Sequence, residues 1–124
     1  MNSGNFCITT LSLCRTKFPD GLKPMADYVR QCGMIPGIWF EFETLGTGCK
    51  YYNASEHLLK RDGDILTIGD RRFFDMSDPW VVDYLSEKVI KLLKDCGFGY
   101  IKVDYNDTIG MGCDDPDGLG KATP

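Results

Sequence analysis

The chain has 124 residues, a length that predicts one domain or part of a larger one. Its formal net charge of −4 leaves no basic surface of the kind that binds nucleic acid. No apolar stretch is long enough to cross a bilayer, which excludes a membrane span. With 43% hydrophobic and 12% aromatic residues, the composition is typical of a globular core.

A first helix is predicted from Leu22 to about Cys32. Pro24 falls in its first turn, where the missing N–H costs nothing, and Gly33 is expected to end it. Apolar residues recur at helical spacing on one face, and these are Leu22, Met25, Ala26, Val29 and Cys32.

A strand is predicted over residues 34–43, from its isoleucine, tryptophan and phenylalanine content. Its side chains alternate between two faces. One face carries Ile38, Phe40 and Phe42, and the other carries Trp39, Glu41 and Glu43. A long loop over residues 44–72 follows, with a small hairpin expected at Asp62-Gly63-Asp64 and the apolar run after it.

A second helix is predicted over residues 80–96. Asp78 is the expected N-cap, Pro79 the first helical residue and Gly97 the end. The predicted buried stripe consists of Val82, Leu85, Val89, Leu92, Leu93 and Cys96. On the outer face, Glu87 and Lys91 have the spacing of an i,i+4 ion pair.

The second predicted strand covers residues 99–106 and alternates most clearly of all. Ile101, Val103 and Tyr105 share one face, and Lys102, Asp104 and Asn106 share the other. Because helices and strands alternate along the chain, a parallel α/β protein is expected.

Two strands cannot close a barrel, and a (β/α)8 barrel needs about 250 residues. The chain is therefore interpreted as an internal, incomplete slice of a TIM barrel, with covering helices on parallel strands. The expected division is an N-terminal segment of residues 1–16 that need not be native, a partial barrel over 17–117 and a truncated tail over 118–124.

The six cysteines show no CxxC spacing, and no secretory signal precedes them. Cys32 and Cys96 each stand before a glycine at the end of an amphipathic stretch, as small buried residues do. Reduced thiols and a cytoplasmic location are therefore expected, with a disulfide framework as the alternative for a secreted chain. His57 has no nearby cysteine or second histidine, so a loop histidine is expected rather than a zinc ligand.

Polar residues at the carboxyl ends of two parallel strands predict a shared pocket. Asp104 lies between Lys102 and Asn106 on one face, and a neighbouring cation favours the ionised carboxylate that a nucleophile requires. Trp39 supplies a flat apolar surface against which a sugar ring stacks. These residue types favour a carbohydrate site. A solvated face of an antiparallel strand, or a metal- or phosphate-site carboxylate, is the alternative interpretation.

Three ordered motifs carry a resemblance to a known family. They read Phe18-Pro-Asp-Gly-Leu-Lys-Pro-Met-Ala-Asp, then Gly37-Ile-Trp-Phe-Glu, then Gly99-Tyr-Ile-Lys-Val-Asp-Tyr-Asn. In this order they resemble the FP-x-GLK-x-LAD, G-L-W-F-E-P-E and Y-I-K-W-D-x-N motifs of the α-galactosidases of glycoside hydrolase family 36. The resemblance extends over residues 17–114.

The resemblance implies a (β/α)8 catalytic barrel and a retaining mechanism. Asp104 matches the family's nucleophile, and Lys102 and Asn106 match residues that bind galactose hydroxyls. Trp39 matches the tryptophan of the substrate pocket, and the sugar-contacting arginine falls on Arg71 or Arg72. Glu41, on the same polar face as Trp39, is a further substrate-binding candidate.

Departures from the family pattern limit what is carried over. Phe42 stands in place of the usual proline and Val103 in place of the common tryptophan. The second carboxyl group that a retaining glycosidase needs, and the early Asp-Asp-Gly-Trp-type strand, are absent from the chain. The acids after the second strand are interpreted as loop acids, and Pro116 argues against a calcium loop; these acids are Asp107, Asp114, Asp115 and Asp117.

The expected function of the parent protein is thus release of galactose from raffinose- or melibiose-type α-galactosides, with an oligosaccharide as its binding partner. No metal or organic cofactor is implied, and the parent is open to homo-oligomerisation. The isolated chain is expected to be inactive. The alternatives are an α-N-acetylgalactosaminidase or raffinose synthase on the same barrel, a non-catalytic carbohydrate-binding or relic fragment, and another α/β enzyme in which Asp104 serves a metal or a proton transfer.

Overall fold

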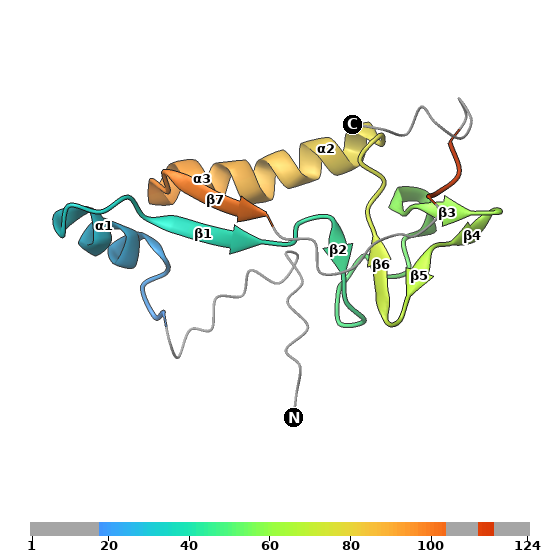
Figure 1. The fold of residues 1–124 in the computed structure, drawn as a ribbon, viewed down its shortest axis with the longest axis horizontal. Helices are drawn as coiled ribbons and strands as arrows, with labels where there is room; N and C mark the ends of the chain where they lie inside the picture. The colour runs from blue at the N-terminus through green and yellow to red at the C-terminus, as the bar shows by residue number, and fades with distance from the viewer. Residues whose placement is uncertain (1–17, 104–111, 116–124) are drawn as a thin grey trace.

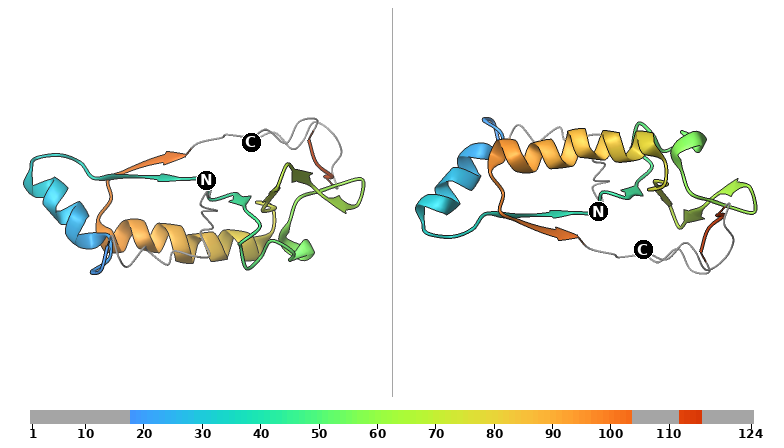
Figure 2. Two further views of the ribbon diagram at one scale, coloured as in Figure 1. Left: turned by 90° about the horizontal axis from the view of Figure 1, so that it is seen from below. Right: turned by 90° about the horizontal axis from the view of Figure 1, so that it is seen from above.

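A computed structural model describes residues 18–103 and 112–115 of the chain. At its centre, β1 (Gly37–Phe40) and β7 (Tyr100–Val103) form a parallel pair in which Gly37 is opposite Tyr100 and Phe40 is opposite Val103 (Figure 1). The chain between them first forms several short strands and then a long helical segment, which lies against one side of the pair in the two turned views (Figure 2). The predicted parallel strand–helix–strand unit is confirmed.

Helix α1 (Lys23–Gln31) precedes β1 and ends where Gly33 adopts a φ of +78°. It packs on α3 (Lys91–Cys96), and Arg30 donates a hydrogen bond to the carbonyl of Gly97 at 2.5 Å. The predicted buried face is only partly right. Ala26 is fully buried, but Met25 and Cys32 are exposed.

The second predicted helix forms as three consecutive segments, namely α2 (Pro79–Leu85), the π-helix η3 (Ser86–Ile90) and α3. Asp78 caps it by accepting a hydrogen bond from the Trp80 amide at 2.8 Å, and Gly97 ends it in the left-handed conformation at φ +68°. Both predicted boundary signals are confirmed.

The buried face of this helix differs in part from the predicted stripe. The predicted Val82 is 45% exposed, whereas Val81 is fully buried together with Leu85 and Val89. Side chains four apart lie on the same face of a helix, and Val81, Leu85 and Val89 therefore form one buried stripe. The predicted pair between Glu87 and Lys91 is likewise absent from the ion pairs of the described residues, since Lys91 pairs with Asp95.

The predicted long loop contains more regular structure than expected. Strand β1 ends at Phe40, short of the predicted residue 43. The chain then forms β2 (Thr44–Leu45), a 3-10 helix η2 (Ser55–His57), and the short strands β3 (Lys60–Arg61), β4 (Asp64–Ile65), β5 (Thr67–Ile68) and β6 (Arg71–Phe73). The expected hairpin at Asp62-Gly63 is confirmed as β3–β4. Strands β2, β6 and β5 form a second, antiparallel sheet in that order.

The hydrophobic core joins the long helix to β1 and to the small sheet. Its buried members are Phe40, Leu45, Cys49, Leu58, Phe74, Val81, Leu85 and Val89. Phe40 is 1% exposed, which fixes the end of β1 against the helix. Packing around this one residue therefore determines which side of β1 faces away from the helix.

Two expectations about single residues are corrected. Cys49 is disulfide-bonded, so the prediction that all six cysteines are reduced is wrong for this residue; disulfides are more typical of oxidising compartments than of the cytoplasm. Among the other described cysteines, Cys96 is buried and free. His57 is not in an irregular loop. It belongs to η2, its Nδ1 lies 2.7 Å from Asp78 Oδ2, and its ring stacks on Trp80 with centroids 3.8 Å apart.

Candidate functional site

The face of the β1–β7 pair opposite the helix carries the candidate polar residues. Trp39 is directly opposite Lys102 in the parallel register. Trp39 is 39% exposed, while the next residue, Phe40, is buried in the core, so the alternation predicted from the sequence is present in β1. Lys102 is exposed, between the partly buried Ile101 and Val103. The parallel register thus places Trp39 and Lys102 at neighbouring positions of the two strands.

The other two residues predicted on this face of the second strand, Asp104 and Asn106, lie outside the described residues. Val103 is the last described residue of β7. The described members of the predicted site come from β1, from the segment that follows it, and from β6 and β7; they are Trp39, Glu41, Arg71, Arg72 and Lys102.

Glu41 and Arg71 connect the end of β1 to the small sheet. Arg71 Nη1 lies 3.3 Å from both carboxylate oxygens of Glu41, and the two side chains are only 16% and 33% exposed for Glu41 and Arg71 respectively. The two residues are 30 positions apart in sequence, so the sheet that contains β6 brings them together. This partly buried ion pair places the Arg71 guanidinium beside Glu41, which follows Trp39 by two positions.

Arg72 has different partners. Its Nη1 donates to the Tyr52 carbonyl at 2.6 Å and to Asn53 Oδ1 at 2.7 Å, and its guanidinium lies 4.2 Å from the centre of the Tyr52 ring. Successive strand residues point to opposite faces, so Arg71 and Arg72 cannot both approach Glu41. The two arginines, equal candidates by the sequence motif, therefore have different surroundings.

Glu43 is a polar residue near this site that was not selected as a candidate. Its Oε2 is buried and makes no hydrogen bond within the described part of the chain. Burial, together with the nearby charge of Glu41, raises the pKa of Glu43 above its ordinary value. The sequence did contain a signal for Glu43, because this residue alternates with Trp39 and Glu41 on the predicted polar face. The two carboxyl groups therefore differ, because Glu41 is paired with a guanidinium, whereas burial raises the pKa of Glu43.

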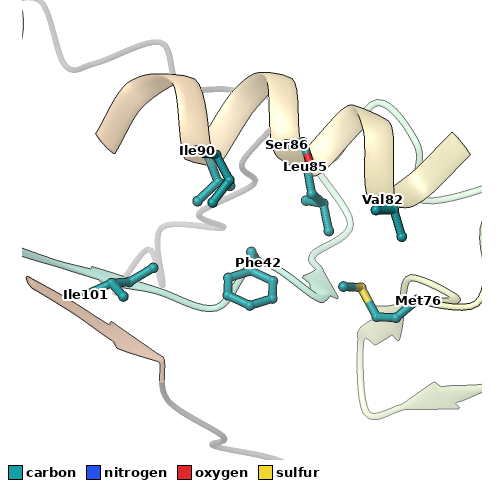
Figure 3. A pocket seen from close by; sticks show the side chains of 8 residues that line it. Phe42, Met76, Val82, Leu85, Ser86, Ile90 and Ile101 are labelled. Atoms are coloured by element: carbon teal, nitrogen blue, oxygen red, sulfur yellow. The ribbon is translucent and has the colours of Figure 1, made fainter. Parts of the chain in front are cut away.

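A hollow of about 190 Å³ lies on the other side of the strands, between them and the long helix (Figure 3). Phe42 and Ile101 line it from the strand side, and Met76, Val82, Leu85, Ser86, Val89 and Ile90 complete the lining. Its surface is almost wholly apolar. It is therefore a gap between packed elements and does not contain the predicted polar residues.

The described residues offer neither a metal site nor a membrane span. Within residues 18–103 and 112–115, no three His, Cys, Asp or Glu side chains gather closely enough to hold a metal ion. Each helix in the same ranges is too short or too polar to cross a bilayer.

The parallel strand pair, the helix that covers one side of it and the polar residues on the other side are typical of α/β proteins. The chain belongs to the melibiase family, whose family model matches residues 2–115. This confirms the resemblance that the three ordered motifs indicated.

Individual relatives agree with this assignment. The alpha-galactosidase Mel36A of Lactobacillus acidophilus is 29% identical over 105 residues, which represent 77% of this chain and 13% of that protein. The crystal structure of the alpha-galactosidase from Lactobacillus brevis is 33% identical, with a TM-score of 0.63 over 73% of this chain and 12% of that one.

A third relative is a solved GH36 alpha-galactosidase, a variant of AgaA from Geobacillus stearothermophilus in complex with stachyose. It is 24% identical, with a TM-score of 0.67 over 80% of this chain and 14% of that one. At this identity the likeness shows the fold alone. The chain thus spans only 12 to 14% of the length of these three relatives.

Proposed function

We propose that this chain is the nucleophile-bearing slice of a (β/α)8 barrel in a retaining α-galactosidase. One observation carries the proposal: in a member of the melibiase family, the Trp39 and Lys102 positions of two separate motifs lie opposite each other on the strand face turned away from the helix. Two distant motifs that converge in this way favour a shared ligand over independent surface roles.

The incompleteness of the unit supports a barrel slice. In the described residues the β1–β7 sheet has only two strands, and such pairs are marginally stable by themselves. Large apolar side chains of the long helix are also left exposed, among them Val82 and Ile90 at 45% each. Neighbouring barrel strands and helices would cover both features.

The proposed chemistry proceeds in two steps. The carboxylate of Asp104 attacks the anomeric carbon of galactose, the glycosidic bond breaks, and the leaving oxygen takes a proton from an acid outside this chain. Water then attacks the covalent galactosyl-enzyme, and that second group accepts its proton. Lys102 and Asn106 hold the sugar hydroxyls, and Trp39 supports the ring through stacking.

The proposed substrates are oligosaccharides of the raffinose and melibiose type with a terminal α-galactose. The related AgaA variant was solved with stachyose, an oligosaccharide of this class. Since that match shows only a shared fold, the substrate is carried to this chain as part of the proposal. A related α-N-acetylgalactosaminidase or raffinose synthase would use the same residues on a different sugar or acceptor.

The test begins with the gene on both sides of this reading frame. If the frame continues into the missing acid motif, the longer protein is expected to hydrolyse an aryl α-galactoside and to release the α-anomer of galactose first, as proton NMR would detect. The 124-residue chain is expected to release nothing, because it lacks the second carboxyl group.

Three results would contradict the proposal. Initial release of the β-anomer would exclude a retaining mechanism. Turnover only with added metal would favour a different α/β enzyme. If the reading frame does not continue and its product binds galactose equally well after Asp104→Asn, a non-catalytic binding module would be favoured.

A matched pair of variants tests which arginine contacts the sugar. In the longer protein, Arg71→Lys is expected to raise KM by about tenfold to a hundredfold, because a hydrogen bond to a charged group contributes roughly 1.5–3 kcal/mol. Arg72→Lys should change KM by less than about twofold, since its guanidinium is held by Tyr52 and Asn53. Equal effects on KM, at equal thermal stability, would reject the assignment of Arg71 to the pocket.

A further inference from the structure

The small antiparallel sheet lies beyond the carboxyl ends of the two parallel strands. Strands β1 and β7 both point toward the side on which β2, β6 and β5 lie (Figure 1 and Figure 2). These three short strands belong to the connection between β1 and the long helix, residues 41–78. In a (β/α)8 barrel, the connections at the carboxyl ends of the strands build the active site. The small sheet is therefore placed to bring side chains to the candidate site.

Strand β6 brings Arg71 to the point at which β1 ends. Its Nη1 lies 3.3 Å from each carboxylate oxygen of Glu41, the residue directly after β1. The backbone of this region is held by the pairing of β2 with β6 and by the amide of Phe74, which donates to the Glu43 carbonyl at 2.8 Å. The backbone thus brings the two residues near each other. The ion pair then fixes where the long arginine side chain, which has many rotamers, ends.

Partial burial distinguishes this contact from an ordinary surface ion pair. Both the Glu41 and the Arg71 side chain are partly buried. Exposed pairs contribute little because water screens them, whereas a buried charge that loses its partner is left poorly solvated. A guanidinium carries five N–H donors, and both contacts with Glu41 come from the same nitrogen, Nη1. An arginine can therefore be anchored by a carboxylate and donate to a second polar group at the same time.

We propose that Glu41 is a positioning residue, which holds the Arg71 guanidinium at the carboxyl end of β1, where Arg71 binds hydroxyl groups of the sugar. The inference rests on the proposed function, because that function places a sugar at this end of the strands. Glu41 acts on the substrate through Arg71. A sugar contact of its own, which the sequence pattern indicated for Glu41, is the alternative that the experiments below distinguish.

Glu41→Gln in the longer protein is expected to raise KM for an aryl α-galactoside by about threefold to tenfold, while kcat changes by less than about threefold. The amide retains the shape and one carbonyl acceptor, but a neutral hydrogen bond is roughly half as strong as a charge-assisted one. The expected effect is therefore about half, in free energy, of that of Arg71→Lys. A rise in KM at nearly constant kcat is typical of lost substrate binding.

A double-mutant cycle separates positioning from direct contact. After Arg71→Ala there is no guanidinium to hold, so the further substitution Glu41→Gln should change KM by less than about twofold. If Glu41 contacts the sugar itself, the two effects on KM multiply and the proposal is wrong. The proposal is also wrong if Glu41→Gln lowers thermal stability but leaves KM unchanged, because the ion pair is then purely structural.

Glu43→Gln is the matched control, since Glu43 follows Glu41 on the same face of the predicted alternation. It changes a carboxyl group whose Oε2 is buried and makes no hydrogen bond within the described part of the chain. This variant should leave kcat and KM unchanged. Equal effects of Glu41→Gln and Glu43→Gln on KM would reject the proposal, because they would show a general response to lost negative charge.

The contact itself can be measured without activity in the 124-residue chain. Urea unfolding, followed by circular dichroism, compares Glu41→Gln, Arg71→Ala and the double variant. If the two side chains interact, the double variant should lose less stability than the sum of the two single losses. Additive losses would show that the side chains do not interact, and the positioning role would then be wrong whatever the activity of the longer protein.

These measurements keep the positioning role and the proposed function apart. If the stability losses are coupled but the longer protein cleaves no α-galactoside, the ion pair forms and the proposed function is wrong, together with the sugar-binding role of Arg71. If the longer protein is active but the losses are additive, the proposed function stands and Glu41 is not a positioning residue.

Discussion

Replacement of Asp104 by asparagine in the longer protein is expected to lower kcat for an aryl α-galactoside by about 10⁴-fold or more. The amide is isosteric with the carboxylate but is too weak a nucleophile to form the galactosyl-enzyme. Steady-state rates with a good leaving group provide the measurement, and circular dichroism verifies that the variant is folded.

Asp107→Asn is the matched control, because it removes a carboxylate three residues further along the same segment. It should retain most of the wild-type kcat. A small nucleophile offers an additional check: with Asp104→Gly, added azide is expected to occupy the vacated space, attack the anomeric carbon and give β-galactosyl azide. Asp104→Asn with more than about a tenth of the wild-type kcat would remove this residue from the mechanism.

Truncation of Phe40 is expected to have the largest effect on stability. Its side chain is 1% exposed and lies in the cluster that joins β1 to the long helix. Phe40→Ala should reduce the free energy of unfolding by about 3–5 kcal/mol, from lost apolar burial and the cavity left behind. Urea unfolding of the 124-residue chain, followed by circular dichroism, measures the change.

Trp39 is the control on the opposite face of the same strand. It is 39% exposed, so Trp39→Ala should cost less than about half as much stability as Phe40→Ala. In the longer protein the same substitution should weaken galactose binding, whereas the stability of the variant remains sufficient for folding. Equal destabilisation by the two substitutions would show that both faces of β1 are packed and that no ligand site opens beside Trp39.

The local features of the fold were predictable from the sequence. Asp78-Pro79 and Gly97 mark the ends of the long helix because capping and left-handed φ depend on the residue and its immediate neighbours. The alternation around Trp39 and Phe40 was readable for the same reason, since strand periodicity is a property of the backbone. The three ordered motifs, which are also local, identified the family.

The arrangement within the helix required the tertiary structure. Val81 is buried instead of Val82 because the packing of the helix on the core selects the face, and helical spacing from Leu85 allows a stripe through either valine.

The pairing of segments that are distant in the sequence also required the tertiary structure. The sequence placed Arg71 and Arg72 as equal candidates, and their separate partners, Glu41 and the Tyr52 carbonyl, are set by the antiparallel sheet of β2, β6 and β5. The hydrogen bonds of Asp114 to the Asp62-Gly63 turn are likewise long-range contacts, whereas the sequence pattern indicated only a loop acid at Asp114. Composition and spacing describe what each segment can form, but which segments meet depends on the packing of the whole chain.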